Sequence, residues 1–479
     1  MSKPITAADV ANFIGSDFIA PDVPQTPVDT DWQIKLAAHI SAFNERYANV
    51  RYVDKQMIMR FTEADENYHG HTDFDLMGQR DFVNLYQNTV IKTGEKAVRG
   101  KVSDTYDNHA NAWLKHPDCR VYHDGVVFRP LPIGAKPLPA SYYNTWQGFV
   151  VEPRSGDWTT IKQHLLEVVC SGDTALYDYL IRWIAYKLQN PHKQAGSAVV
   201  LRGKKGSGKG TLGHFLLSLY GAHGMHISNS DHLTGKFNAH LANCCLLFAD
   251  EAFFSGDKRG QGALKALITE PTITIEPKWV AVHQQPNYLQ ILMATNEAWA
   301  VPVSADDRRY CVIDVSSDRI GDRAYFNKVH RALAQESVKA AFLFDMLNLE
   351  LGNWHSGDIP DTDALKDQRL YSLDSVGQFL VDGYQSGGFT SNSLMEAQWR
   401  DYINATELYN CYLHYCDRMK IDQYGRLTQA AFGRVAVTEA KLYKDDKGRG
   451  KTIRYCLHSI DDYKARLEDS YRIILDKQG

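Results

Sequence analysis

The sequence predicts an α/β fold built on a parallel sheet, with a small α/β module before it and a mostly helical region after it. A short apolar strand at residues 197–202 runs directly into a glycine-rich loop and then into a helical stretch at 211–221. Two further apolar runs, 243–254 and 288–296, have the length of buried strands. Beyond residue 318, apolar residues recur at helical spacing. Strands alternating with helices favour a parallel sheet.

The length of 479 residues predicts about three domains. Residues 1–30 are rich in proline and acid without periodicity, which indicates a flexible tail or linker. We expect an N-terminal α/β module over 31–150 and the sheet core over 151–330. Residues 331–479 form the predicted helical C-terminal region.

Charge and hydrophobicity limit the partners of the protein. The net charge is −4, so any binding to nucleic acid depends on local patches of positive charge. No apolar run approaches the roughly 20 residues that span a bilayer, and the N-terminus has no signal-peptide pattern. We therefore expect no membrane association and a location in the cytoplasm or nucleoplasm.

The glycine-rich loop, LRGKKGSGKGTL at 201–212, has the composition of a phosphate-binding P-loop. In such loops, backbone N–H groups surround the phosphates and a lysine reaches the outer ones. Gly210 follows Lys209 directly, so the hydroxyl comes one position late, at Thr211. The loop alone does not distinguish a small nucleotide kinase from a motor protein. Its candidate nucleotide-binding residues are Gly203, Gly206, Ser207, Gly208, Lys209, Gly210 and Thr211.

Two carboxylates end the apolar run that follows the loop. Asp250 would hold Mg²⁺ through water, and Glu251 would orient and deprotonate the attacking water. In isolation, an acidic strand end that meets solvent is the simpler interpretation. The position of the pair after the loop, in the order that a nucleotide-hydrolysing fold requires, favours the catalytic one.

Polar residues also follow the next predicted strand. Asn296 could sense the terminal phosphate, or it could cap the following segment. Arg308 and Arg309 could include the arginine that, in ring ATPases, reaches the nucleotide of a neighbouring subunit. The alternative is a surface salt-bridge cluster, because Asp306 and Asp307 precede the two arginines.

The ordered series GKKGSGKGT, FADE, TITIEPKW, ATN and DRRY resembles superfamily 3 helicases. It is most similar to the helicase half of phage and mobile-element primase-helicases, relatives of the poxvirus primase-helicase. The resemblance covers about residues 43–316 and, more faintly, the C-terminal tail. It implies an AAA+-like core, a hexameric ring with ATP at the subunit interfaces, and 3′→5′ translocation on single strands. A small nucleotide kinase has no need of the later motifs.

The same resemblance assigns roles to individual residues. Lys209 and Thr211 take the loop roles, and Asn296 takes the sensor role. Asp250 and Thr211 are the candidate Mg²⁺ ligands, Asp250 partly through water, and Glu251 activates the water.

A predicted β-hairpin lies between the carboxylates and Asn296. Residues 272–276 alternate as a strand does, Pro277 breaks the pattern, and the alternation resumes at 280–282, which places Lys278 and Trp279 near the tip. In papillomavirus and polyomavirus helicases the matching hairpin carries a Lys-His pair into the ring pore. Here the indole replaces the imidazole and could stack on a base while Lys278 binds phosphate. The alternative is an ordinary surface hairpin.

The C-terminal segment of about 404–460 resembles the winged-helix end of these helicases. Residues 429–436 would form the recognition-type helix and 444–455 the wing. Lys447, Arg449 and Lys451 in the wing are candidate DNA contacts. The alternative is a structural cap with a solvated basic hairpin.

These inferences predict an ATP-dependent replicative DNA helicase of a phage or mobile element, acting as a homo-oligomer on single-stranded and forked DNA. A separate primase or polymerase is a candidate partner. Asp73 and Asp75 match the DxD spacing of a primase, but the surrounding module is too small for a primase domain. The alternative function is an ATP-dependent DNA-binding factor that loads or assembles a replication complex without unwinding.

Overall fold

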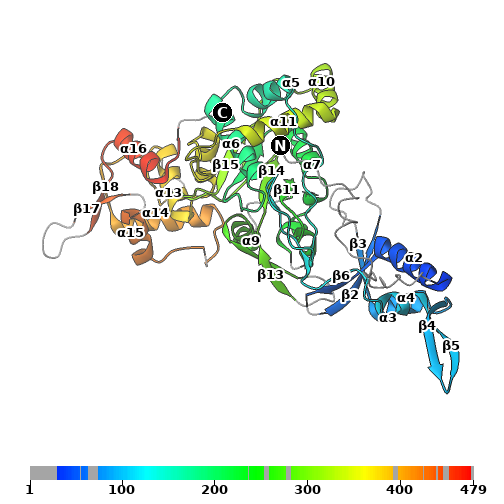
Figure 1. Cartoon of the computed structure of the whole chain (residues 1–479). Coiled ribbons are helices and arrows are strands. Elements are labelled where there is room, and N and C mark those ends of the chain that lie inside the picture. The colour runs from blue at the N-terminus through cyan, green and yellow to red at the C-terminus, as the bar shows by residue number, and fades with distance from the viewer. Residues whose placement is uncertain are drawn as a thin grey trace, which may run out of the picture. The chain divides into compact units, whose positions relative to one another are not determined.

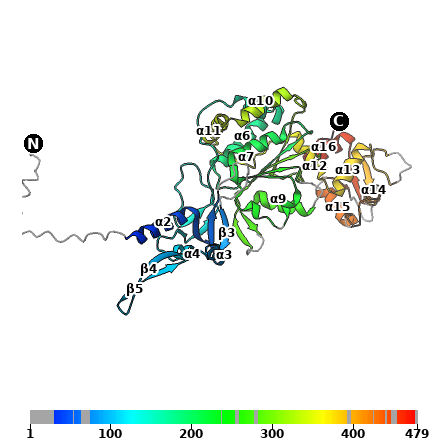
Figure 2. The same ribbon diagram turned by 90° about the vertical axis from the view of Figure 1, so that its right-hand side faces the viewer.

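A computed structural model describes residues 30–53, 55–62, 74–235, 237–252, 258–276, 282–391, 397–423, 425–438, 441–445 and 453–475 (Figures 1 and 2). These residues form two compact units. The first contains 30–50, 55–62 and 74–122, and the second contains 51–53 and all described residues from 123 onward.

The first unit is a four-stranded sheet covered by helices. The strand order is β3-β2-β1-β6, in which β1 and β6 are parallel and β2 and β3 antiparallel, and β4 and β5 form a separate hairpin. Its core is aromatic: Phe43, Phe82 and Trp113 pack together with centroid distances of 5.5–6.3 Å. The elements are α2 (Asp31–Arg46), β1 (Tyr47–Tyr52), β2 (Lys55–Phe61), β3 (Phe74–Gly78), α3 (Gln79–Leu85), β4 (Ile91–Val98), β5 (Lys101–Asp107), α4 (His109–Leu114) and β6 (Val121–Tyr122).

The second unit is built on a parallel sheet, as the sequence predicts, and the sheet has five strands where three were expected. Its order is β10-β11-β14-β9-β15. The sheet is buried on both faces, and its strands are therefore almost continuously apolar. The strands are β9 (Ala198–Arg202), β10 (Gly224–Ile227), β11 (Leu246–Asp250), β14 (Gln290–Thr295) and β15 (Tyr310–Asp314).

The register brings the carboxyl ends of three strands to one edge. Asp250 pairs with Ala294, and Ala294 pairs with Leu201 on the other side. Glu251, Asn296 and the start of the glycine loop therefore follow the sheet at nearly the same level. In open parallel sheets, ligands bind outside the carboxyl ends of the strands.

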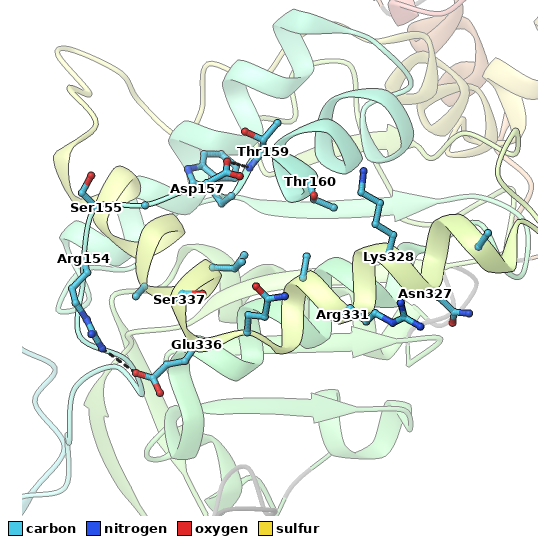
Figure 3. A pocket seen from close by; sticks show the side chains of 17 residues that line it. Arg154, Ser155, Asp157, Thr159, Thr160, Asn327, Lys328, Arg331, Glu336 and Ser337 are labelled. Atoms are coloured by element: carbon cyan, nitrogen blue, oxygen red, sulfur yellow. Dashed lines mark hydrogen bonds and ion pairs between the residues drawn. The ribbon is translucent and has the colours of Figure 1, made fainter.

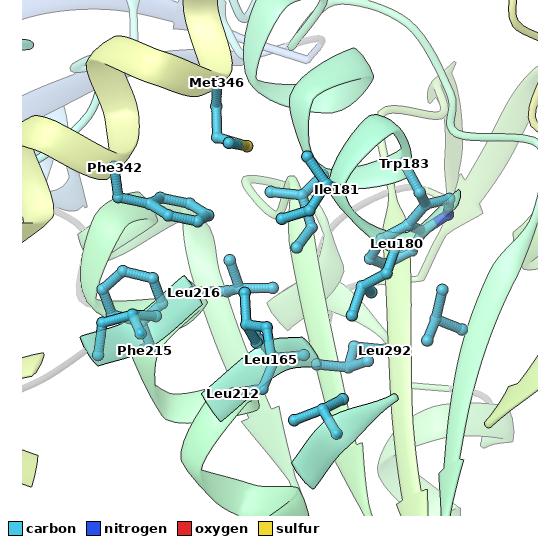
Figure 4. Packing of buried hydrophobic residues seen from close by; sticks show 14 of the residues in the cluster. Leu165, Leu180, Ile181, Trp183, Leu212, Phe215, Leu216, Leu292, Phe342 and Met346 are labelled. Carbon is cyan, nitrogen blue, oxygen red and sulfur yellow. The ribbon is translucent and has the colours of Figure 1, made fainter. Parts of the chain in front are cut away.

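Helices cover both faces of this sheet (Figure 2). On one face lie α5 (Thr159–Gln163) with the π-helical turn η1 (His164–Val169), α6 (Thr174–Gln189), α7 (Lys209–Tyr220), α10 (Arg323–Ala334) and α11 (Glu336–Asn348). Figure 4 shows their packing, in which Phe215 of α7 lies near Phe342 of α11. The other face is covered by α9 (Lys258–Thr269) and the first half of α12 (Asp363–Tyr371). Short elements complete it: β7 (Gly125–Val127), β8 (Tyr142–Asn144), η2 (Gly221–His223), α8 (Ser230–Thr234) and η3 (Ala239–Leu241).

The predicted hairpin between the carboxylates and Asn296 is present, but its return strand begins later than expected. Strand β12 (Thr272–Ile275) pairs antiparallel with β13 (His283–Pro286). Val282, which we expected within the return strand, precedes it and is 57% exposed. Lys278 and Trp279 lie outside the described residues.

The C-terminal region is mostly helical, as the sequence predicts, and has its own hydrophobic core. A small antiparallel sheet of order β16-β18-β17 packs with its helices. Across the described ranges, no helix combines the length and apolarity of a membrane span. The elements are α13 (Ser375–Gln385), β16 (Tyr402–Asn404), α14 (Ala405–Arg418), α15 (Gln429–Thr438), β17 (Tyr443–Asp445), β18 (Arg454–Cys456) and α16 (Ile460–Tyr471).

One buried histidine, His223 of η2, is hydrogen-bonded through both ring nitrogens to backbone groups. It is 3% exposed. Its Nε2 accepts from Gln147 N (3.0 Å), so Nδ1 carries the proton and donates to Asn243 O (3.1 Å). Burial lowers the pKa of His223 to about 4, because a charged ring would be desolvated and would turn a second N–H toward that of Gln147.

We therefore expect this residue to make the fold sensitive to acid. In the unfolded chain His223 binds a proton below about pH 6.5, whereas in the folded protein it does so only near pH 4. The free energy of unfolding therefore falls by roughly 3 kcal/mol as the pH falls from about 6.5 to 4. His223→Gln keeps a donor and an acceptor but cannot be protonated. Denaturant unfolding at pH 7 and pH 4.5 should show a smaller loss of stability in the variant. Equal losses would contradict this assignment.

Candidate functional site

The glycine-rich loop joins β9 to α7 through backbone conformations that suit glycine. Gly206 and Gly208 have φ values of 83° and 98°, which side-chain-bearing residues rarely adopt. A Cβ at Gly208 would also lie 2.9 Å from a ring carbon of Phe326. The loop therefore turns tightly against α10 and enters α7 at Lys209.

The Lys209 ammonium is enclosed by three acceptors. Lys209 is 6% exposed, and its Nζ donates to Gly203 O (2.7 Å), Lys204 O (3.1 Å) and Asn296 Oδ1 (2.7 Å). Burial lowers its pKa, and the nearby charges of Glu251 and Asp250 oppose that shift. The structure thus brings the predicted loop lysine and the predicted sensor asparagine into direct contact.

The two carboxylates lie at the adjacent strand end. Glu251 has a φ of 54°, a left-handed conformation that costs a non-glycine residue about 1–3 kcal/mol. Its backbone N–H donates to Ala294 O (2.9 Å), and its Oε2 lies 3.4 Å from Asn296 N. Asp250 Oδ2 lies 3.9 Å from His226 Nε2 on the edge strand β10. The strained backbone turns Glu251 back toward Asn296.

These groups line a cavity of about 840 Å³ that extends from the loop along α7, α10 and α11. Most of the nucleotide-binding and catalytic residues predicted from the sequence line this cavity. Gly203, Ser207, Arg308 and Arg309 do not. His330 and Lys339 were not expected from the sequence, because an isolated polar residue on a predicted helix carries no motif. Burial lowers the pKa of Lys339. The lining is Lys205, Gly206, Gly208, Lys209, Gly210, Thr211, His214, Phe215, Ser218, Asp250, Glu251, Asn296, Phe326, His330, Leu333, Ala334 and Lys339.

A larger cavity, of about 1000 Å³, lies between residues 154–160 and helices α10 and α11 (Figure 3). Arg154 and Glu336 form an ion pair of 3.1 Å beside it, and both side chains are 70% exposed, so the pair adds little to stability. This cavity includes neither the glycine loop nor a pair of carboxylates at strand ends. The smaller cavity is therefore the candidate site.

The two adjacent arginines have different environments. Arg309 donates twice to Asp307, from Nε to Oδ1 (2.9 Å) and from Nη2 to Oδ2 (2.8 Å), and the Asp307 side chain is 1% exposed. These hydrogen bonds raise the pKa of Arg309. Arg308 is exposed and has no hydrogen bond or ion pair with another described residue. The salt-bridge alternative thus fits Arg309, while Arg308 remains available to a group outside the chain.

Several predicted residues fall elsewhere. Asp75 on β3 is ion-paired to Arg60 on β2, and Asp73 lies outside the described residues. The candidate wing residues Lys447, Arg449 and Lys451 lie outside them too.

We expect the two arginines to differ in their effect on stability. Arg309→Ala would leave a buried carboxylate without its guanidinium, which should cost about 2 kcal/mol or more. Arg308→Ala should change the free energy of unfolding by no more than about 0.5 kcal/mol. Denaturant titration of both variants measures the difference, and equal effects would show that the Asp307 pair is not structural.

Comparison with known proteins gives a partial match in sequence and a broader match in fold. Residues 201–309 match the model of a family of unknown function, DUF5906. The chain is 28% identical over 154 residues to a protein named DNA Primase-polymerase from Nitratiruptor phage NrS-1. The aligned segment is 30% of this chain and 21% of that protein. The match thus spans about a fifth of the relative.

Solved structures of the C-terminal region of NrS-1, residues 305–718, share the fold. One covers 90% of this chain and 100% of its own, with a TM-score of 0.58 and 16% identity. A second covers 88% and 99%, with a TM-score of 0.55 and 16% identity. A third, of the same region, covers 86% and 96%, with a TM-score of 0.57 and 15% identity.

Proposed function

We propose that this chain is an ATP-driven DNA helicase that serves the replication of a phage or mobile element. One observation carries the proposal: the Lys209 ammonium, the Asp250 and Glu251 carboxylates and the Asn296 amide converge at one edge of a parallel sheet, beside a glycine loop. This is the set of groups that nucleoside triphosphate hydrolysis needs.

The strand order supports an AAA+-like P-loop core. Strand β14 lies between the loop strand β9 and the carboxylate strand β11. This order inserts Asn296 between Lys209 and Glu251, and Asn296 bonds to Lys209 while its N–H faces Glu251. A polar residue so placed can respond to the terminal phosphate and help to orient water.

The site fits ATP and Mg²⁺ in its chemistry. The loop backbone and Lys209 suit phosphates, and the cavity continues past Phe326 toward His330 and Lys339, with room for a ribose and a base. Asp250 offers the oxygen ligand that Mg²⁺ prefers, with Thr211 as a second candidate at the cavity wall. Bound Mg²⁺ would neutralise developing charge on the phosphates.

The chain's own residues then divide the work. Lys209 would exchange its carbonyl acceptors for phosphate oxygens. The carboxylate of Glu251 would accept a proton from the attacking water, and its 3.4 Å approach to Asn296 N indicates how the carboxylate is oriented. Helices α7, α10 and α11 would shield the cavity from bulk water.

A ring assembly would explain Arg308. Its guanidinium does not line the cavity of its own subunit and is free to reach the nucleotide of a neighbour, where such an arginine raises the rate by about 10³–10⁵. We propose a homo-oligomer, most simply a hexameric ring, with ATP at each interface.

DNA contacts are proposed for two places. The β12–β13 hairpin would present Lys278 and Trp279 to a single strand in the pore. Helices α14 and α15 beside the antiparallel sheet β16-β18-β17 support a winged-helix assignment, and the wing would bring Lys447, Arg449 and Lys451 to DNA.

The similarity to a phage primase-polymerase supports a role in phage DNA replication. A phage replication protein would act in the cytoplasm of the infected bacterium, with a primase or polymerase as a candidate partner. Strand displacement from a forked duplex by the purified full chain tests the proposal. ATP-dependent displacement is expected. ATP hydrolysis stimulated by single strands without displacement would instead indicate the loading factor.

The core residues should separate nucleotide binding from turnover. Lys209→Ala removes the phosphate-binding cation and should weaken ATP binding. Glu251→Gln keeps the shape of the site but cannot take a proton, so it should bind ATP normally and turn over at least about 100-fold more slowly. Titration with a fluorescent ATP analogue and steady-state hydrolysis measure the two effects. Equal loss of binding in both variants would mean that Glu251 is misassigned.

Arg308 should act across subunits. Arg308→Ala and Lys209→Ala subunits are each expected to be inactive. Mixed rings, however, contain interfaces that pair an intact loop with an intact arginine, so mixing should restore hydrolysis. The matched control, Arg308→Ala mixed with a chain carrying both substitutions, should recover nothing. No recovery in the first mixture, with subunit exchange shown by a fluorescent label, would rule out the shared site.

A further inference from the structure

The segment between Asn296 and Arg308 has no regular structure of its own. Residues 296–309 connect β14 to β15 without a helix or strand, and residues 297–307 form the loop between the two side chains. The positions of Asn296 and Arg308, at its two ends, therefore depend on the groups that hold its backbone in place. Since buried backbone groups require partners, those partners determine where the two side chains lie.

One side chain of helix α12 supplies three of these partners. Gln368 is 0% exposed. Its Oε1 accepts from Ala300 N (2.6 Å) and Val301 N (3.2 Å), and its Nε2 donates to Ala298 O (2.7 Å). These three bonds join one carboxamide to one short loop, so they hold the loop at a fixed distance from α12.

The next turn of the chain adds a second anchor. Ser372 Oγ accepts from Val303 N (3.0 Å) and from Trp299 Nε1 (3.1 Å), and it donates to Gln368 O (2.6 Å). The hydroxyl proton of Ser372 is donated to Gln368 O, and the two lone pairs of Oγ accept both hydrogen bonds from the loop.

A third contact ties the loop to the glycine-loop strand. Arg202, the last residue of β9, donates to Ala298 O (3.0 Å) and to Asp367 of α12 (2.9 Å). It also forms two bonds to Asp314 at the end of β15 (2.6 and 2.7 Å). These bonds join β9, β15, the loop and α12 directly below the candidate site.

Helix α12 itself packs into two hydrophobic cores. Ala364 and Leu365 belong to the core beneath the sheet. Leu370, and Leu373 just beyond the helix, pack against the core of the C-terminal region. A movement of the C-terminal region would therefore reach the loop through α12.

We propose that Gln368 is a positioning residue for nucleotide hydrolysis, and that α12 thereby connects the C-terminal region to Asn296 and Arg308. The inference rests on the proposed function. Gln368 does not line the nucleotide cavity, so it acts through the loop. Loss of its bonds would let both ends of the loop shift, and misplacement by about 1 Å can cost roughly 100-fold in rate.

Gln368→Met tests this in the full chain, because methionine has a similar shape and no hydrogen-bonding carboxamide. The affinity for a fluorescent ATP analogue should stay within about twofold of wild type, since the glycine loop is untouched, while kcat at saturating ATP and single-stranded DNA should fall at least about tenfold. Ser372→Ala, a smaller change, should lower kcat in the same direction.

Gln189→Met is the matched control. Gln189 of α6 donates to Met346 O (2.7 Å) and Leu349 O (2.9 Å), so the variant loses similar bonds far along the chain from the loop. Gln189→Met should lower the melting temperature about as much as Gln368→Met does, but it should keep the wild-type kcat.

The outcomes separate this inference from the proposed function. A wild-type chain without ATP hydrolysis would refute the function itself. Hydrolysis by wild type with unchanged kcat in Gln368→Met, or in Ser372→Ala if the first variant does not fold, would overturn only the positioning role. A loss of kcat equal to that of Gln189→Met would also overturn it, because the effect would then reflect stability alone.

Discussion

The contact between the Lys209 ammonium and its three acceptors is the constraint on which the candidate site depends. Two acceptors are loop carbonyls, Gly203 O and Lys204 O, and the third is the Asn296 side chain from the neighbouring strand. A buried ammonium is costly without such partners. The glycine loop must therefore fold back over its own lysine, and β14 must lie beside β9. One buried charge thus links the shape of the loop, the neighbouring strand β14 and the position of Asn296.

The loop between Asn296 and Arg308 shows a different way of holding functional residues. It has no regular hydrogen bonding, and Gln368 of α12 and Ser372 just after that helix satisfy its backbone in the middle. Near its end, Asp307 of the loop itself pairs with Arg309. Such a segment can be precise and still change position when its supports move, which a strand in the middle of a sheet cannot do. That property would suit the proposed function, in which hydrolysis responds to DNA and to neighbouring subunits.

Much of this arrangement was predictable from the sequence, because the groups at the strand ends are close to apolar runs whose pattern is unambiguous. The parallel sheet and the meeting of Lys209, Asp250, Glu251 and Asn296 follow from that pattern. Strands β10 and β15 were not predicted. Gly224–Ile227 is short and includes a glycine and a histidine, and Tyr310–Asp314 directly follows the charged residues 306–309. The difference between Arg308 and Arg309 depends on the burial of Asp307, and the role of Gln368 on contacts about 70 residues away in the chain. Neither leaves a local signal. The predicted DNA contacts Lys278, Trp279, Lys447, Arg449 and Lys451 stay predictions.

The structure of the full chain bound to Mg²⁺ and a non-hydrolysable ATP analogue would test the central claim most directly. We predict that Lys209 Nζ leaves Gly203 O and Lys204 O and binds phosphate oxygens, with the metal beside Asp250 and with Glu251 and Asn296 facing the terminal phosphate. A nucleotide bound elsewhere, such as in the cavity beside residues 154–160, with Lys209 still bonded to its own loop, would contradict the account.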